Sequence, residues 1–90
     1  MDFDYLKKKR ILLVDDEQEL LDMVRSILTD DGFTNIKTAG NVKDALQISK
    51  SYCPELAILD VMLPDGDGFS LMEQLKSRAD YPILFLTARG

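Results

Sequence analysis

The sequence predicts an α/β fold, in which a parallel sheet carries helices on both faces. Three short apolar runs without polar alternation lie at residues 11–14, 56–59 and 83–86, and such runs are typical of strands covered on both sides. The segments between them place apolar residues at three- and four-residue spacing, which indicates amphipathic helices. The chain has 90 residues and no internal repeat or linker, so one domain is expected.

The composition excludes several classes of protein. Hydrophobic residues make up 46% of the chain and charged residues 30%, which is the profile of a soluble globular protein. The net charge of -5 argues against an electrostatic nucleic-acid partner. No apolar stretch approaches the ~20 residues that cross a bilayer, and the run Ile11–Val14 is too short for a signal peptide. The single cysteine, Cys53, forms no intrachain disulfide, so we expect a cytoplasmic protein with no membrane partner.

The first strand and helix are clear in the sequence. Residues 1–9 form a charged, solvated lead-in, and the continuous apolar run Ile11–Val14 is the first strand. A helix is predicted over roughly residues 18–30, and Gly32 fits its C-terminal stop. The expected buried stripe of this helix consists of Leu20, Met23, Val24, Ile27 and Leu28.

The second strand and helix give a weaker signal. Residues 33–39 do not alternate cleanly, so an edge strand is expected there. Asn41 is a good N-cap residue for a helix over about residues 42–50. Pro54 prevents that helix from continuing.

The third and fourth strands complete the predicted sheet. Leu56–Asp60 is an apolar run that ends in a single acid, and a glycine-rich turn then leads into a helix over about residues 68–78. We expect Phe69 to pack beneath that turn. Residues 83–86 form the fourth strand. The order βαβαβαβ predicts parallel strands joined by right-handed crossovers.

Polar residues follow three of the four predicted strands. Asp15 and Asp16 follow the first, Asp60 ends the third, and Thr87 follows the fourth. Because parallel strands end at one edge of the sheet, these side chains should converge, at the place where open α/β sheets bind ligands. Clustered carboxylates raise one another's pKa unless a cation is present, and magnesium accepts one or two carboxylates while keeping waters.

Such a site could accept a phosphoryl group. One of the aspartates could act as a nucleophile, and the hydroxyl group of Thr87 could hydrogen-bond a phosphoryl oxygen. The alternative for Asp60 is a purely local role, in which it caps or hydrogen-bonds the turn that follows it.

Other motifs are excluded by their spacing. The turn Asp65-Gly66-Asp67-Gly68 lacks the further acids of a calcium-binding EF-hand loop, and it matches neither glycine-rich nucleotide-binding pattern. The chain has no histidine. This excludes a Ser-His-Asp triad and histidine-ligated zinc.

The chain resembles the receiver domain of bacterial two-component response regulators, in the style of the subfamily whose receivers precede a winged-helix DNA-binding domain. Three segments carry the resemblance: residues 11–17 (Ile-Leu-Leu-Val-Asp-Asp-Glu), 58–68 (Ile-Leu-Asp-Val-Met-Leu-Pro-Asp-Gly-Asp-Gly) and 86–90 (Leu-Thr-Ala-Arg-Gly). It extends over residues 10–90. It implies a flavodoxin-like doubly wound sheet with strand order 2-1-3-4.

The resemblance implies roles for the acidic residues. Asp60 would be the phosphoacceptor and would receive its phosphoryl group from a histidine of a sensor kinase. Asp16 would bind Mg²⁺ directly, and Asp15 would bind it mainly through water. Met62 would offer its backbone carbonyl to the metal, and its side chain would flank the site.

The resemblance also implies roles near the end of the chain. Thr87 would be the switch hydroxyl, Ala88 would leave room for the phosphoryl group, and Arg89 would flank the site. The parent protein would control transcription, whereas this segment would not touch DNA. We expect no enzyme activity beyond self-phosphorylation and dephosphorylation.

One departure from the family pattern is large. The family domain normally continues through a helix, a fifth strand that ends in a phosphoryl-binding lysine, and a last helix. The sequence lacks this part, so we expect a C-terminally truncated receiver domain. Lys9 precedes the first strand and is expected ~20 Å away, at the wrong edge of the sheet. Arg89 is then the only plausible nearby cation.

The departure has structural consequences. The fourth strand would be an open edge, which invites pairing with another chain, and the helix at 18–30 would expose an apolar patch. We therefore expect self-association as a dimer or higher oligomer, by edge pairing or exchange of elements. Two alternatives remain open: a receiver-like assembly fragment that is never phosphorylated, and a small aspartyl-phosphate enzyme of unrelated α/β fold.

Overall fold

The computed structural model describes residues 4–86 and contains a four-stranded parallel sheet. Its spatial order is β2-β1-β3-β6, which confirms the predicted order 2-1-3-4. The strands are β1 (Ile11–Val14), β2 (Ile36–Ala39), β3 (Leu56–Asp60) and β6 (Ile83–Leu86). β1 and β3 lie at the centre of the sheet because each pairs with two neighbours.

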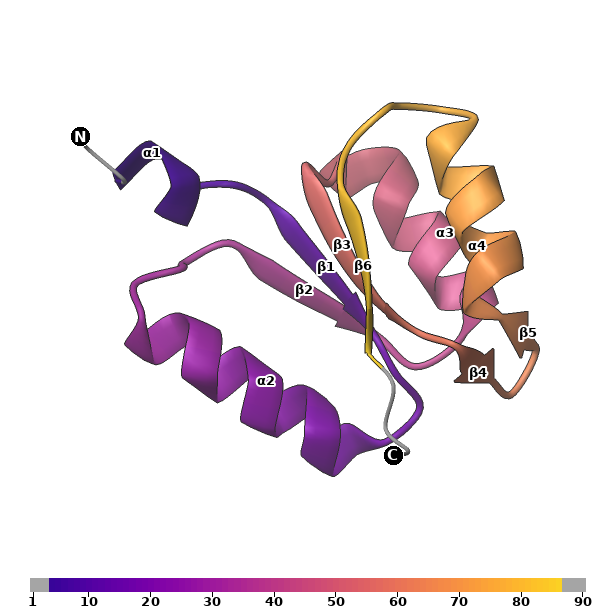
Figure 1. Ribbon diagram of the computed structural model, residues 1–90, viewed down its shortest axis with the longest axis horizontal. Helices are drawn as coiled ribbons and strands as arrows, with labels where there is room; N and C mark the ends of the chain where they lie inside the picture. Colours follow the sequence, from indigo (N-terminus) through magenta and orange to yellow (C-terminus); the bar gives the residue numbers. More distant parts are fainter. Residues whose placement is uncertain (1–3, 87–90) are drawn as a thin grey trace.

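Helices cover both faces of the sheet (Figure 1). α2 (Gln18–Asp30) lies on one face, and α3 (Val42–Tyr52) and α4 (Gly68–Lys76) lie side by side on the other. α2 has the predicted bounds. α3 extends two residues past the predicted end, and it ends where Cys53 adopts the left-handed conformation, with φ of 53°.

Each face of the sheet buries its own apolar cluster. The α3–α4 side is formed by alternate strand residues and by inward residues of the two helices: Leu12, Val14, Ala57, Leu59, Ala45, Leu71 and Leu75. The α2 side is smaller, with Ile11, Leu13, Leu21 and Ile58 as its buried members. The central strands are therefore buried on both faces, as their unbroken apolar runs predict.

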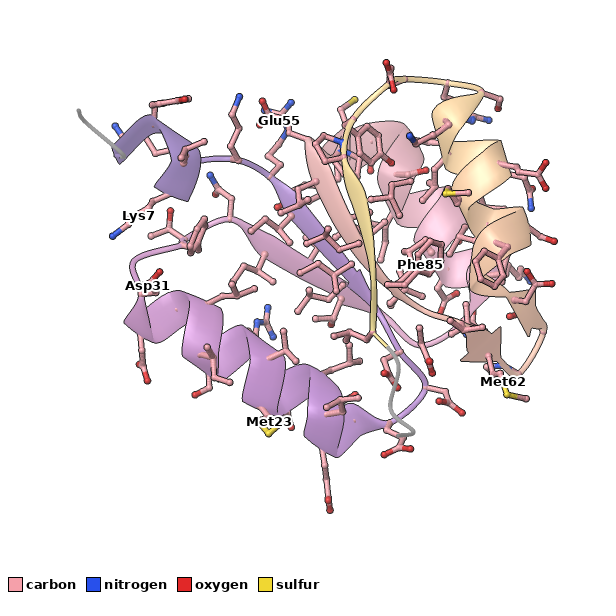
Figure 2. All side chains as sticks on the ribbon, in the orientation of Figure 1. Lys7, Met23, Asp31, Glu55, Met62 and Phe85 are labelled. Carbon is pink, nitrogen blue, oxygen red and sulfur yellow. The ribbon has the colours of Figure 1, made fainter. Side chains whose placement is uncertain are left out.

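The predicted buried stripe of α2 is partly wrong. Leu21 is the buried residue of this helix, and Val24 and Leu28 are half-buried against the sheet. Met23 and Ile27, which were assigned to the stripe, are 52% and 59% exposed. Figure 2 shows Met23 on the side of α2 turned away from the sheet. The helix faces the sheet along the Leu21–Val24–Leu28 line, so the other two residues fall outside the contact.

The β6 edge is open within residues 4–86. β6 pairs with β3 on one side only, and it ends the sheet. Leu84 on this strand is 56% exposed. Leu84 thus exposes apolar surface on the edge strand, and Met23 and Ile27 expose further apolar surface on α2.

The lead-in contains a short helix that the sequence analysis missed, α1 (Asp4–Lys7). Backbone and side-chain bonds hold its end to the approach of β2: the N–H of Thr34 donates to the carbonyl of Lys7 (3.2 Å), and the Asn35 amide donates to the carbonyl of Lys8 (2.7 Å). These contacts bring the start of the described chain against the amino end of the sheet.

A small hairpin follows β3 and was also missed. β4 (Met62–Leu63) pairs antiparallel with β5 (Gly66–Asp67). The buried side chain of Leu63 joins the larger apolar cluster, and the N–H of Gly68 donates to the carbonyl of Val61 (2.8 Å). The turn after Asp60 is therefore an ordered, closed structure.

Gly68 is required where α4 begins. A Cβ atom there would collide with the carbonyl oxygen of Asp60 and lie 3.1 Å from the Phe85 ring. Phe69 does not pack beneath the hairpin as expected. It is 53% exposed, and its ring lies 4.8 Å from that of Phe85.

We predict that Gly68→Ala lowers the free energy of unfolding by about 1–3 kcal/mol, the usual cost of overpacking. The clash is with backbone, which cannot turn away. Gly66→Ala is the matched control, because its Cβ would meet only the side chain of Val42, 3.1 Å from a methyl carbon, and no backbone atom. Urea denaturation measures both variants, and equal losses would contradict the assignment.

Glu55 joins the lead-in to the amino end of β3. It accepts hydrogen bonds from the backbone N–H of Arg10 (3.1 Å) and from Lys9 (3.3 Å), and the Arg10 guanidinium lies 3.4 Å away. The Arg10 N–H is the main cause that lowers the pKa of Glu55 from its ordinary value of 4.5. A lowered pKa means that the ionised form stabilises the folded state.

We predict that this stabilisation is present above pH 4.5 and is lost as the pH falls through the lower pKa of the folded state. The difference in stability between the wild type and Glu55→Gln should then be present at pH 7 and vanish in acid. Urea midpoints measured across this range check the sign. A difference that grows as the pH falls would contradict it.

Candidate functional site

The register of the sheet brings three aspartates together. Val14 of β1 pairs with Leu59 of β3, so the next residues, Asp15 and Asp60, lie side by side at the carboxyl edge. Asp16 follows Asp15 directly. One carboxylate oxygen from each of the three lies within 4.8 Å of the others.

Asp15 is the buried member of this acidic cluster. It is 1% exposed, and its backbone N–H donates to the carbonyl of Ala39 on β2 (3.1 Å). Its Oδ1 accepts a hydrogen bond from the backbone N–H of Glu17 (2.9 Å). Its Oδ2 is buried and has no hydrogen-bond partner within residues 4–86.

The pKa of Asp15 is raised above its ordinary value of 3.8. Burial is the largest cause, and the Glu17 N–H opposes it. Repulsion from Asp60 and Asp16 adds smaller increases. Repulsion was the only cause expected from the sequence, but burial contributes more, because Asp15 directly follows the fully buried β1 and lies in the protein interior.

These residues fit a hard divalent cation. A buried carboxylate oxygen without a partner is costly unless a donor or cation reaches it. Asp16 is exposed and Asp60 is half-buried, so the cluster opens to solvent on one side. All-oxygen ligands with solvent access suit Mg²⁺, which keeps several of its waters.

The remaining predicted site residues fall into two groups. Met62 lies in β4, two residues after Asp60, and its side chain is 70% exposed. Thr87, Ala88 and Arg89 lie outside the described residues, so their roles stay predictions.

Lys9 lies at the opposite end of the sheet from the acidic cluster. Its Nζ is 3.3 Å from Glu55, at the amino end of β3. Its distant position therefore agrees with the expectation from strand length.

Sequence reasoning missed two further acids of the hairpin. Asp67 is the N-cap of α4 and accepts from the N–H of Ser70 (2.8 Å). Asp65 accepts from the N–H groups of Val42 (2.7 Å) and Lys43 (3.0 Å), at the start of α3. The position of Asp67 just before a helix could have identified it. The partners of Asp65 are 22 and 23 residues away, and no local pattern marks them.

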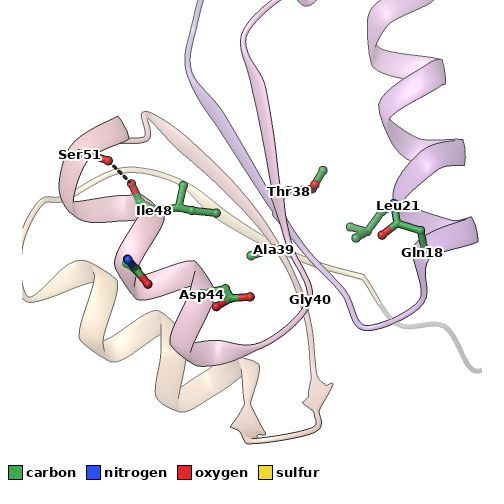
Figure 3. A pocket seen from close by; sticks show the side chains of 9 residues that line it. Gln18, Leu21, Thr38, Ala39, Gly40, Asp44, Ile48 and Ser51 are labelled. Atoms are coloured by element: carbon green, nitrogen blue, oxygen red, sulfur yellow. Dashed lines mark hydrogen bonds between the residues drawn. The ribbon is translucent and has the colours of Figure 1, made fainter.

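A surface hollow whose lining includes none of the three clustered aspartates is formed by residues of α2, β2 and α3 (Figure 3). It has a volume of about 410 Å³ and lies along the free edge of β2, between α2 and α3. Its lining combines polar and apolar residues: Gln18, Leu21, Thr38, Ala39, Gly40, Asp44, Gln47, Ile48 and Ser51. None of these is a predicted site residue, so the acidic cluster is the better candidate on chemical grounds.

Among residues 4–86, no helix has the length and apolar character needed to cross a membrane.

Curated proteins with similar sequences are named as regulatory or transcriptional regulatory proteins. The chain is 39% identical over 82 residues to the regulatory protein VanRc of Enterococcus gallinarum, with 91% of this chain and 35% of that protein aligned. It is 36% identical over 85 residues to the transcriptional regulatory protein YvrH of Bacillus subtilis (strain 168), with 94% and 36% aligned. The chain thus spans about a third of the length of these relatives.

Solved structures share the fold. The non-phosphorylated HemR receiver domain from Leptospira biflexa superposes with a TM-score of 0.82 at 36% identity, and the match covers 91% of this chain and 66% of that one. The MaeR response regulator bound to beryllium trifluoride gives a TM-score of 0.83 at 26% identity, with 91% and 69% covered. The family model described as "Response regulator receiver domain" matches residues 11–90. The chain therefore belongs to the response regulator receiver domain family.

Proposed function

We propose that this chain is a Mg²⁺-dependent phosphoacceptor domain and that Asp60 receives the phosphoryl group. The observation that carries the proposal is the acidic cluster, in which Asp15, Asp16 and Asp60 meet at the carboxyl edge of the sheet. Asp60 is half-buried, so its carboxylate is accessible to a phosphodonor. The buried Oδ2 of Asp15, which has no hydrogen-bond partner within residues 4–86, supports cation binding at this cluster.

The nucleophile of the transfer is a carboxylate. An oxygen of Asp60 attacks the phosphorus atom of a phosphorylated histidine on a sensor kinase. The new O–P bond forms as the P–N bond breaks, and the imidazole leaves. Aspartate is an established nucleophile in phosphoryl transfer.

A bound metal ion would offset the charge of the three carboxylates and of the incoming phosphoryl group. Asp15, Asp16 and Asp60, together with the backbone carbonyl of Met62, would hold it. Asp16 would contact it directly, and Asp15 would act mainly through water. Thr87 would supply the switch hydroxyl, and Ala88 and Arg89 would flank the phosphoryl group.

The relatives support a role in transcription for the longer protein. VanRc and YvrH are named as regulatory and transcriptional regulatory proteins. We propose that this segment, a lead-in over 1–9 followed by a receiver domain over 10–90, receives a signal from a cytoplasmic kinase domain. Regulation of transcription would then occur through another part of the protein.

We also propose that this chain self-associates. Exposed Leu84 on the open β6 edge and exposed Met23 and Ile27 on α2 are the supporting observations. Strand edges with unpaired backbone groups favour pairing with a second chain. If phosphoryl transfer fails on the folded protein, this assembly role becomes the leading alternative function.

We predict that Mg²⁺ and a small phosphodonor give a single phosphoryl adduct, because the acceptor, the acids and the metal suffice for transfer. Intact mass spectrometry detects the adduct. It should be absent from Asp60→Asn and after chelation with EDTA. Asp80→Asn is the matched control, since Asp80 is exposed and lies between α4 and the amino end of β6, whereas the acidic cluster lies at the carboxyl edge of the sheet.

Circular dichroism on each sample keeps the result interpretable. A folded wild-type protein without adduct would contradict the phosphoacceptor proposal and favour the assembly fragment. An adduct that persists in Asp60→Asn would assign the acceptor to another residue.

We predict that the average mass rises with protein concentration in light scattering, because the exposed edge and patch are covered on association. Leu84→Lys should shift the population toward monomer, since edge charges oppose strand pairing. Gln74→Lys on the exposed side of α4 adds the same charge elsewhere and should have no such effect. A monomer at all concentrations would refute self-association.

A further inference from the structure

Asp65 lies at the tip of the β4–β5 hairpin and bonds to a distant helix. Its two carboxylate oxygens accept from the backbone N–H groups of Val42 and Lys43, at 2.7 Å and 3.0 Å. The first N–H groups of a helix have no partner within that helix. Asp65 therefore supplies two of the acceptors that α3 needs.

The same helix end has a second, local cap. Asn41 accepts from the N–H of Asp44 through its side chain (2.7 Å). The two caps serve different N–H groups of one helix terminus. Asn41 connects α3 only to its own sequence neighbours, whereas Asp65 connects it to the hairpin.

The hairpin is held at its base as well as its tip. At the base, the N–H of Gly68 donates to the carbonyl of Val61 (2.8 Å), and the buried side chain of Leu63 anchors β4 in the core. At the tip, Gly66 lies against Val42 so closely that a Cβ would be 3.1 Å from its methyl carbon. Met62 lies between these two attachments.

The start of α3 is also close in sequence to the end of β2, which is bonded to Asp15 of the acidic cluster. The carbonyl of Ala39 accepts from the N–H of Asp15 (3.1 Å), and only Gly40 and Asn41 separate Ala39 from Val42. The bonds from Val42 and Lys43 to Asp65 thus connect two parts of the site. One is the hairpin that follows Asp60, and the other is the start of α3, which follows the end of β2 that is bonded to Asp15.

The charge of Asp65 suits this position. The N–H groups of Val42 and Lys43 lower the pKa of Asp65, so the carboxylate is ionised at neutral pH. A negative charge near a helix N-terminus is favourable. An asparagine here would keep one acceptor oxygen and lose both the second acceptor and the charge.

We propose that Asp65 is a positioning residue for the phosphoacceptor site: it anchors the hairpin to α3 and so holds Met62 in place relative to Asp60 and Asp15. This inference rests on the proposed function, because it treats the Met62 carbonyl as a metal ligand. Its first consequence, an anchored hairpin, can be measured without any metal.

The test compares Asp65→Ala and Asp65→Asn with Asn41→Ala, the matched control that removes the other cap of the same helix. Loss of the anchor should speed amide hydrogen exchange across residues 61–68 and weaken Mg²⁺ binding, measured by calorimetry. Substitution of residues that hydrogen-bond to metal ligands typically lowers metal affinity 10- to 100-fold. Asp65 acts on Met62 only indirectly, through the hairpin. We therefore expect Asp65→Ala to lower Mg²⁺ affinity about three- to tenfold and Asp65→Asn to lower it less.

Asn41→Ala should lower thermal stability while leaving exchange over 61–68 and Mg²⁺ affinity close to those of the wild type. Equal exchange and equal Mg²⁺ affinity in Asp65→Ala and Asn41→Ala would overturn the proposal and reduce Asp65 to a helix cap. If Asp65→Ala unfolds, the same comparison with Asp65→Asn decides. A wild type that binds no Mg²⁺ would refute the proposed function and the metal part of this inference, and hydrogen exchange would then decide whether Asp65 anchors the hairpin.

Discussion

The burial of Asp15 at the end of a central strand is the constraint on which the site depends. β1 is buried on both faces and pairs on both edges, so its direction and register carry the next residue into the interior. Burial then raises the pKa of that carboxylate and leaves one of its oxygens without a partner among residues 4–86. A bound cation would give that oxygen a partner. The neighbouring acids could share in binding it, and the side of the cluster that faces solvent would admit it.

Much of the fold could be predicted because its signals are local. The runs at 11–14, 56–59 and 83–86 give strands because no polar residue interrupts them, and Asn41 caps its helix through its own side chain. The position of the acids also followed from a general property of parallel sheets. What required the structure was contact between distant residues. The hairpin at 62–67 consists of two-residue strands, which are too short to show periodicity.

The errors have physical causes of the same kind. Met23 and Ile27 share the helical spacing of a buried stripe, yet α2 presents a different line to the sheet, and sequence spacing cannot fix the rotation of a helix about its axis. The role of Asp65 depends on hydrogen bonds to residues 22 and 23 positions away. The sequence around Asp65 indicates only a turn and does not identify these partners. Burial of Asp15 exceeded repulsion as the cause of its raised pKa, because the depth of the strand end is a tertiary property.

The central place of β1 has a consequence for how the chain folds during synthesis. β1 is made first of the four strands, but its partners are residues 36–39 and 56–59. Both of its edges can therefore be paired only after residues 56–59 have left the ribosome, and long-range pairing of this kind is intrinsically slow. Until then Ile11–Val14 is an exposed apolar segment with unpaired backbone groups. The basic residues just before it, Lys7, Lys8, Lys9 and Arg10, form the kind of flanking sequence that limits aggregation of such a segment.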